Sequence, residues 1–230
     1  MNKFQNKPIS NYIIIYISGC IATLSLPPFS VLPLIFAIGF GIYLISLTPS
    51  LLKTFFAAWV LGFGWFSVGL YWIGSAFIVA DTYNVYFMPI AIVLLPSLLA
   101  CFWGVACVLA KLIDKDKNFS FISIIICLSF FEYLRANLFT GFPWLMPSMI
   151  FSSNEHLIQI FSFIGSFSTN LVVFTCSVLP FILLSSFKSK YIVSTMLLIP
   201  ILILIFSGIF RFNNKDLLKI KNQLVTIVQP

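Results

Sequence analysis

Long apolar runs divided by short connectors constrain the fold of this chain more strongly than any other feature. Of its residues, 60% are hydrophobic and only 8% are charged, whereas a typical soluble domain has about 25% charged residues. Most of the runs approach the roughly 20 residues that an α-helix needs to cross a bilayer core of about 30 Å. The sequence therefore predicts an all-α polytopic membrane protein with about seven transmembrane helices. The expected spans cover residues 12–26, 31–47, 54–78, 86–110, 119–138, 157–184 and 191–210.

Lysines occur in alternate connectors, and this pattern predicts an orientation. The connectors around residues 27–30, 79–85 and 139–156 contain neither Lys nor Arg. Cytoplasmic connectors are normally enriched in Lys and Arg, so we expect the N-terminus in the cytoplasm and the segment from Arg211 onward outside it. Because the positive charges are spread over connectors rather than gathered in one patch, the sequence argues against a nucleic-acid partner. The lysines expected on the cytoplasmic side are Lys3, Lys7, Lys53, Lys111, Lys115, Lys117, Lys188 and Lys190.

Glu132 and Arg135 are the candidate functional charges, because they lie three residues apart inside an apolar run. A charge in the hydrocarbon core costs roughly 2.5–3.5 kcal/mol on insertion scales, so the pair needs a local reason. Residues three apart share one face of a helix. One interpretation is an ion pair that is satisfied within the bundle. The other is that Arg135 contacts a lipid phosphate, for which a guanidinium is well suited, while Glu132 orients it.

Two aromatic segments are the further candidates for lipid contact. Gly141, Phe142, Pro143 and Trp144 follow the charged pair directly and favour an irregular interfacial loop. This loop is either an anchor or one lip of a lipid-entry groove. Trp72 lies in the expected 54–78 helix, where Gly62 and Gly69 permit close packing. The large rings of that helix either pack in the core or form a wall for acyl chains.

The sequence offers no convincing catalytic centre and predicts no metal or other cofactor. The five cysteines lie in apolar runs without CxxC spacing, which is typical of small buried residues. A cysteine nucleophile would need a neighbouring base and an electropositive setting. His156 is the single histidine, so a site with several histidine ligands is excluded. No catalytic residue is therefore assigned in this chain.

Four sequence blocks resemble the membrane part of bacterial apolipoprotein N-acyltransferases. The strongest is Glu132-x-x-Arg135 followed by Thr140-Gly141-Phe142-Pro143-Trp144-Leu145. The others are Gly62-Phe63-Gly64-Trp65-Phe66, Gly69 with Trp72-Ile73, and Val225-Thr226-Ile227-Val228-Gln229-Pro230. The last block is similar to the strand that opens the nitrilase-like α/β domain of that family.

The resemblance implies an acyltransferase of the bacterial inner membrane. A Glu-Lys-Cys triad in the family's periplasmic nitrilase-like domain takes an acyl chain from a phospholipid as a thioester. It passes that chain to the α-amino group of the diacylglyceryl-modified N-terminal cysteine of a lipoprotein. The implied partners are the phospholipid acyl donor, the diacylglyceryl-apolipoprotein and, if the protein is split, a separate nitrilase-like chain. The lipid- or substrate-binding candidates are Glu132, Arg135, Gly141, Phe142, Pro143, Trp144 and Trp72.

The matching blocks also imply a division of the chain into two parts. Residues 1–212 would form the transmembrane domain. Residues 213–230 would form a periplasmic linker and the first strand, at residues 224–228, of a nitrilase-like domain that is otherwise missing. No Glu, Lys or Cys of this sequence matches the triad, so we expect this fragment to supply anchoring and lipid access and to be inactive alone.

The sequence leaves two other classes of function open. A small polytopic transporter or channel could be built around Glu132 and Arg135, although the other spans offer few polar residues. A non-catalytic scaffold that binds lipid or lipoprotein would share every sequence feature of the acyltransferase membrane domain.

Overall fold

The structure is a computed structural model and describes residues 8–80, 84–114, 120–138, 141–185 and 190–213. These parts of the chain form helices and turns and contain no strand. The expected strand at residues 224–228 lies outside the described residues. The α-helices are α2 (Pro8–Thr23), α3 (Phe36–Ser46), α4 (Leu51–Gly69), α5 (Ile73–Ala80), α6 (Met88–Ile113), α7 (Ser120–Asn137), α8 (Ile160–Leu184) and α9 (Lys190–Asn213). Short 3₁₀ helices are η1 (Leu32–Ile35), η2 (Asn84–Phe87), η3 (Pro147–Phe151) and η4 (Leu157–Gln159).

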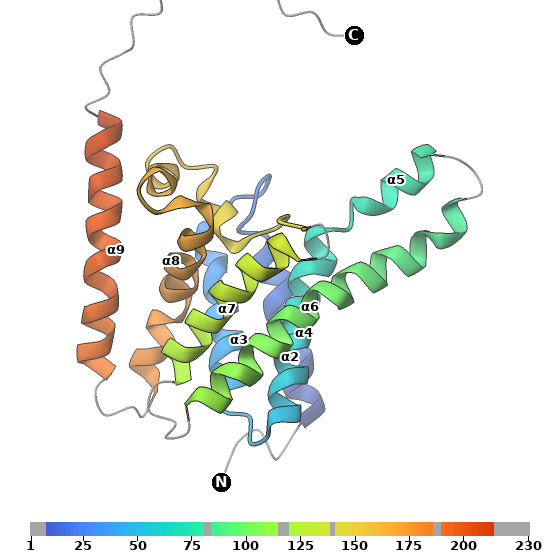
Figure 1. Ribbon diagram of the computed structural model, residues 1–230, viewed down its shortest axis with the longest axis horizontal. Helices are drawn as coiled ribbons and strands as arrows, with labels where there is room; N and C mark the ends of the chain where they lie inside the picture. Colours follow the sequence, from blue (N-terminus) through green and yellow to red (C-terminus); the bar gives the residue numbers. More distant parts are fainter. Residues whose placement is uncertain (1–7, 81–83, 115–119, 139–140, 186–189, 214–230) are drawn as a thin grey trace, which may run out of the picture.

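Helix α4 lies at the centre of the bundle and packs most extensively against α2 and α6. The bundle continues from α6 to α7 and from α7 to α8, while α3 joins α2 to α8. Helix α9 stands at one edge, where it contacts α8 and η4. At the opposite edge, α5 and the first half of α6 extend away from the bundle (Figure 1). One edge of the bundle is therefore a single packed helix, α9, and the other is a projecting pair of helices, α5 and the first half of α6.

Glycines set the close approach of several helix pairs. A Cβ atom added to Gly39 of α3 would lie 1.7 Å from the Ser177 carbonyl oxygen of α8, and one added to Gly64 of α4 would lie 2.3 Å from the Tyr16 oxygen of α2. Gly62, which the sequence marked as a packing position, approaches the Ala100 backbone of α6. Gly69 instead faces the Leu145 side chain. Small residues thus bring backbones together, as expected for helices in lipid.

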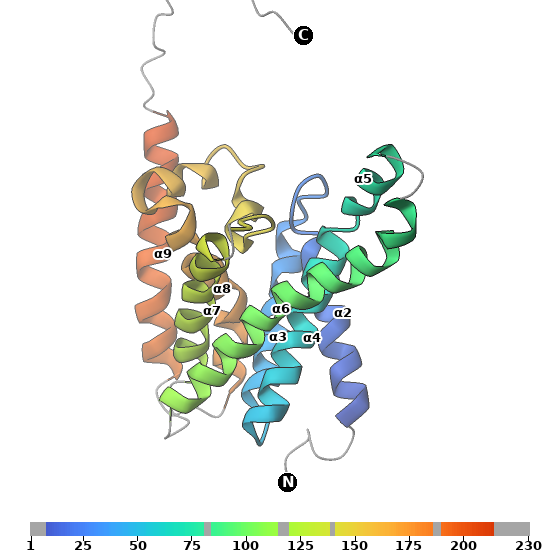
Figure 2. The same cartoon turned by 45° about the vertical axis from the view of Figure 1, so that its right-hand side comes forward.

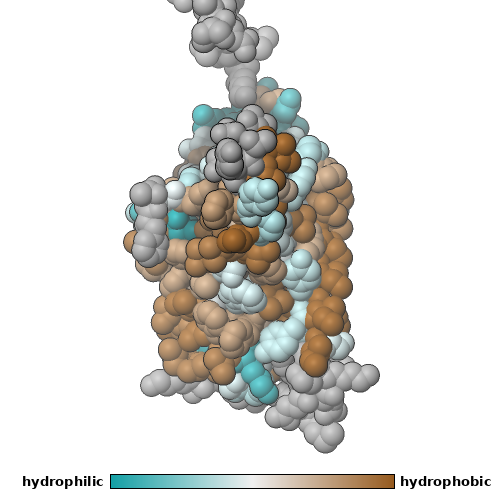
Figure 3. All heavy atoms as spheres, turned by 90° about the vertical axis from the view of Figure 1, so that its right-hand side faces the viewer, coloured by the Kyte–Doolittle hydropathy of each residue, from teal (hydrophilic) through white to brown (hydrophobic). Residues whose placement is uncertain are grey.

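Four helical segments are long and apolar enough to cross a membrane: Leu51–Gly69, Val85–Ile113, Leu157–Leu184 and Lys190–Asn213. Helices α2 and α3 are apolar but shorter. The number of seven crossings therefore stays a prediction. Exposed apolar side chains cover much of the face that presents α5 and α6 (Figure 3). On α6, the side chains of Ile90, Val93, Leu94 and Leu98 are each more than half exposed, as expected for a surface in contact with lipid.

The expected single helix at residues 54–78 is wrong, because the chain breaks it into α4 and α5. Helix α4 ends at Gly69, and Leu70 leaves the helical conformation with φ −104° and ψ 8°. The 19 residues of α4 already span about 28 Å, close to the thickness of the hydrocarbon core. Tyr71 and Trp72 follow with 70% and 40% exposure. Amphipathic rings of this kind favour the membrane interface, which explains a turn at this point.

Helix α8 is also interrupted, at Gly165. Its φ of 77° and ψ of 166° belong to a region that essentially only glycine adopts. The segment expected as one span at residues 157–184 therefore begins with η4 and a short helical piece before its main part.

The ends of the bundle agree with the grouping of the lysines. The start of α2, the α3–α4 connector, the end of α6 and the start of α9 all lie at one end of the bundle in both views (Figures 1 and 2). Lys111 and Lys190 belong to two of these segments, and Lys53 lies in the first turn of α4, directly after the α3–α4 connector. The described parts of the connectors without Lys or Arg lie at the other end. Which end faces the cytoplasm stays a prediction of the positive-inside rule.

Candidate functional site

Glu132 and Arg135 form an ion pair on α7, one helical turn before its end. Arg135 Nη2 lies 2.6 Å from Glu132 Oε2, and Arg135 Nε donates to Glu132 Oε1 at 3.2 Å. Both side chains are fully buried. The three-residue spacing puts them on the same helix face, and the two parallel hydrogen bonds match the planar guanidinium fork to the carboxylate.

Trp103 of α6 completes the coordination of the carboxylate. Its Nε1 donates to Glu132 Oε1 at 2.7 Å, so the acid accepts hydrogen bonds from two helices. The indole is itself fully buried and packs against the rings of Trp65, Phe66 and Phe174. The Phe66 ring also lies below the guanidinium, with its centroid 5.0 Å from Arg135 Cζ. The charges therefore sit in an aromatic shell that excludes water and strengthens their attraction.

The other end of the guanidinium holds the loop of residues 141–146. Arg135 Nη1 donates to the carbonyl oxygens of Phe142 at 2.5 Å and Trp144 at 3.0 Å. Trp65 Nε1 donates to the Leu145 carbonyl at 3.0 Å. Three carbonyls of an irregular segment thus obtain the partners that buried backbone groups require.

Two positive φ angles shape this loop. Gly141 has φ 79°, and a Cβ atom at this position would lie 2.3 Å from the Ala136 carbonyl oxygen. Only glycine fits such a site. Leu145 also adopts a positive φ, of 56°, which is uncommon for a residue with a Cβ atom. Its side chain packs against Gly69, where an added Cβ atom would lie 2.3 Å from Leu145 Cδ1.

The loop places Trp144 against Trp72, which lies in the turn between α4 and α5. The two indoles stack with their centroids 4.7 Å apart and an interplanar angle of 22°. Trp72 is 40% exposed and Trp144 is 49% exposed, so the stack presents a large apolar surface. Phe142 extends it, with its ring 5.5 Å from that of Trp144. We call Trp72, Phe142 and Trp144 the aromatic cap.

The structure brings all seven candidate residues into one connected cluster. Glu132 and Arg135 lie inside it, Gly141 permits its bend, and Pro143 is exposed beside the aromatic cap. Thr140 falls outside the described residues. Sequence reasoning missed Trp103, and it named Trp65 as a core or acyl-wall ring without its hydrogen bond to the loop. Each is an indole N–H in an apolar helix and must find an acceptor when buried.

The chemistry of the cluster is that of positioning and apolar contact. Among the described residues, no group of three His, Cys, Asp or Glu side chains could hold a metal ion. The five cysteines are free thiols. The cluster consists of a loop whose backbone carbonyls accept hydrogen bonds from the buried Arg135 guanidinium, and of an exposed pair of stacked indoles next to that loop.

Comparison with known proteins identifies the family. Residues 18–179 match the model of the apolipoprotein N-acyltransferase N-terminal domain. This stretch contains every candidate residue of the cluster. The chain belongs to the apolipoprotein N-acyltransferase family.

Individual apolipoprotein N-acyltransferases support this assignment. The protein of that name from Rhodopseudomonas palustris is 29% identical over 228 residues, which cover 95% of this chain and 42% of the relative. The one from Agrobacterium fabrum is 31% identical over 72% of this chain and 34% of its own length. The one from Caulobacter vibrioides is 27% identical over 72% of this chain and 32% of its own length. The chain thus spans between about a third and two fifths of these apolipoprotein N-acyltransferases.

Proposed function

We propose that this chain is the membrane anchor and lipid-access part of an apolipoprotein N-acyltransferase. The reaction it serves moves an acyl chain from a phospholipid to the N-terminal diacylglyceryl-cysteine of a bacterial lipoprotein. Membership of the family, the apolar helices and the exposed indole pair support this role. The single observation that carries it is the stack of Trp72 on Trp144, because an exposed apolar platform at the end of a bundle is suited to acyl chains.

The seven candidate residues would have three different roles: lipid contact, positioning of the loop, and the bend of its backbone. Trp72, Phe142, Pro143 and Trp144 would contact the lipid, since their side chains reach the surface or border the aromatic cap. Glu132 and Arg135 would act as positioning residues, because both are buried and their polar atoms are engaged by the protein. Gly141 would supply the bend that lets Phe142 and Trp144 reach Arg135.

The covalent chemistry would be supplied by a nitrilase-like domain. In that scheme a cysteine thiolate attacks the phospholipid ester, forms a thioester and releases a lysophospholipid. The α-amino group of the lipoprotein cysteine then attacks the thioester, which forms an amide and restores the thiol. This chain would hold that domain at the outer face of the inner membrane, with the N-terminus in the cytoplasm and the aromatic cap near the headgroups.

The proposal is tested by complementation in cells depleted of their own N-acyltransferase. The chain is produced with a nitrilase-like domain from a relative, and lipoprotein N-termini are examined by mass spectrometry. A third acyl chain is expected with both polypeptides present and not with either alone. If both accumulate in the membrane and lipoproteins keep two acyl chains with every domain tried, the proposal fails.

Variants then test the role of the aromatic cap. The double variant Trp72→Ala, Trp144→Ala is expected to reduce triacylation at least tenfold while the protein still accumulates in the membrane. Tyr86→Ala is the control, because it removes an exposed ring, 82% accessible, from η2 outside the cap. Equal triacylation in the two variants would argue against lipid contact at the cap.

A further inference from the structure

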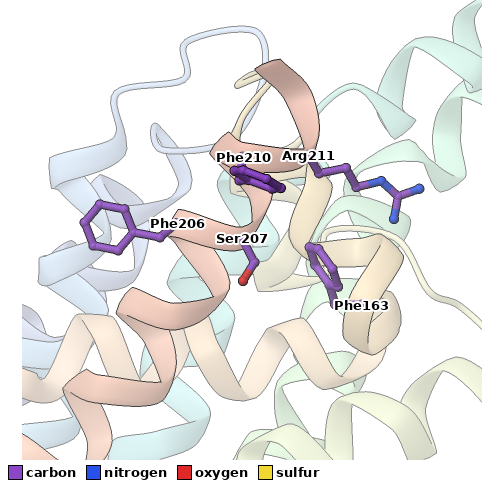
Figure 4. A pocket seen from close by; sticks show the side chains of 5 residues that line it. All are labelled: Phe163, Phe206, Ser207, Phe210 and Arg211. Atoms are coloured by element: carbon purple, nitrogen blue, oxygen red, sulfur yellow. The ribbon is translucent and has the colours of Figure 1, made fainter. Parts of the chain in front are cut away.

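An apolar hollow lies at the edge of the bundle formed by α9, away from the aromatic cap. It has a volume of about 550 Å³ and opens between the start of α8 and the end of α9. Figure 4 shows the Arg211 side chain extending over the Phe163 ring, with Ser207 between Phe163 and Phe206 in this view. The hollow is lined by Phe163, Phe206, Ser207, Phe210 and Arg211.

The surroundings of the hollow favour lipid as its occupant. Only 11% of the apolar window of α9 is buried, the lowest share among the four candidate spans. Phe206 and Phe210 are 65% and 72% exposed. In a bilayer this face of α9 meets acyl chains, and rings projecting beside a hollow give those chains a fixed place to pack.

Arg211 supplies a positioned positive charge at the rim of the hollow. Its Nη1 donates to Ser162 Oγ at 2.8 Å, and its Cζ lies 5.7 Å from the centroid of the Phe163 ring. Both partners are neutral, and the ion pair of the described residues is the one between Glu132 and Arg135. The contacts therefore fix the guanidinium without neutralising it, and its remaining N–H groups suit a phosphate.

The position of Arg211 along α9 matches the depth of a phosphate. From Lys190 to Arg211 the helix rises by about 31 Å, close to the hydrocarbon thickness of about 30 Å. The two basic residues thus mark the two interfaces, and Arg211 belongs to the one opposite Lys53 and Lys111. Charge and depth together select an anionic headgroup in that leaflet.

We propose that this hollow binds one phospholipid, with its phosphate on Arg211 and an acyl chain against Phe163, Phe206 and Phe210. This site is separate from the aromatic cap, since α9 and α5 lie at opposite edges of the bundle (Figure 1). The bound lipid would fill the gap between the end of α9 and the first piece of α8.

The test uses the full chain in liposomes that contain phosphatidylglycerol with a diazirine on one acyl chain. After illumination, the adducts are mapped by peptide mass spectrometry. The wild-type chain is expected to carry adducts at Phe163 or within residues 206–210. Arg211→Gln should lower their yield about fivefold, the effect of one basic residue at a membrane surface. Ser207→Trp, which fills the hollow and keeps the charge, should lower it as well.

Lys53→Gln is the matched control, because it removes the same charge from an exposed position at the other end of the bundle. It should leave the adducts at residues 206–210 unchanged. Unchanged yields in both Arg211→Gln and Ser207→Trp would overturn the proposal. So would capture of a protein segment, and no lipid, by benzoylphenylalanine placed at Phe210, since a helix would then occupy the hollow.

Discussion

Trp103 Nε1 lies 2.7 Å from Glu132 Oε1 and donates a hydrogen bond that joins α6 to α7. The same carboxylate pairs with Arg135, which in turn holds the carbonyls of Phe142 and Trp144. A continuous chain of polar contacts therefore runs from the core of the bundle to the aromatic cap. Substitutions at the residues that make these contacts, and at the glycines that shape the loop and the bundle, have testable consequences.

Trp103→Phe removes the indole donor and keeps an aromatic ring in the core. Glu132 then loses a buried, charge-assisted hydrogen bond, so we expect a loss of about 1.5–3 kcal/mol in the free energy of unfolding. Trp59→Phe is the control, because Trp59 Nε1 donates to the neutral Ser97 carbonyl in a partly buried site and should cost about 0.5–1.5 kcal/mol. Denaturant unfolding in detergent micelles measures both. Equal losses of unfolding free energy in the two variants would show that the charge on Glu132 does not strengthen the hydrogen bond from Trp103.

A double variant that exchanges the two charges, Glu132→Arg with Arg135→Glu, should lose function. The exchanged pair can still attract, but the guanidinium no longer reaches the carbonyls of residues 142 and 144, and the Trp103 N–H faces a cation. We expect triacylation of lipoproteins to fall at least tenfold in the complementation assay. Full activity of the exchanged protein would mean that the pair serves only as an internal ion pair.

Gly141→Ala should distort the loop that carries Trp144. The new Cβ atom meets the Ala136 carbonyl oxygen and also forces a positive φ, so we expect a loss of at least about 1–2 kcal/mol. Gly165→Ala is the control, because Gly165 has φ 77° but nothing within 4 Å of the added Cβ atom. It should cost only the backbone strain. Thermal unfolding measures both variants, and a Gly141→Ala protein as stable as the unsubstituted chain would contradict the described loop.

Gly39→Ala should separate α3 from α8. The added methyl group would lie 1.7 Å from the Ser177 carbonyl oxygen, and backbone cannot move aside as a side chain can, so a loss of about 1–3 kcal/mol is expected. Gly74→Ala should be nearly neutral, because its methyl group meets only the flexible ends of Ile92 and Met88. Melting temperatures in detergent check the difference. A stabilised Gly39→Ala protein would rule out this helix crossing.

The positions of most helices could be predicted from the sequence, because short connectors divide the apolar runs along it. The break between α4 and α5 could not, since residues on both sides of Leu70 are equally apolar and the turn depends on where the interface falls. The Glu132–Arg135 pair was visible from its spacing. Its tie to Trp103 and the stacking of Trp72 on Trp144 depend on contacts between distant segments, which local patterns do not encode.

The most direct test of the whole account is the sidedness of the loop that carries Trp144. Single cysteines are introduced by Pro143→Cys in the loop and by Lys53→Cys at the lysine-bearing end, and intact spheroplasts are treated with a membrane-impermeant maleimide. The unsubstituted chain gives the background from its own five cysteines. The account predicts that position 143 is labelled in intact spheroplasts and position 53 only after permeabilisation. Labelling of position 53 but not 143 in intact spheroplasts would contradict it.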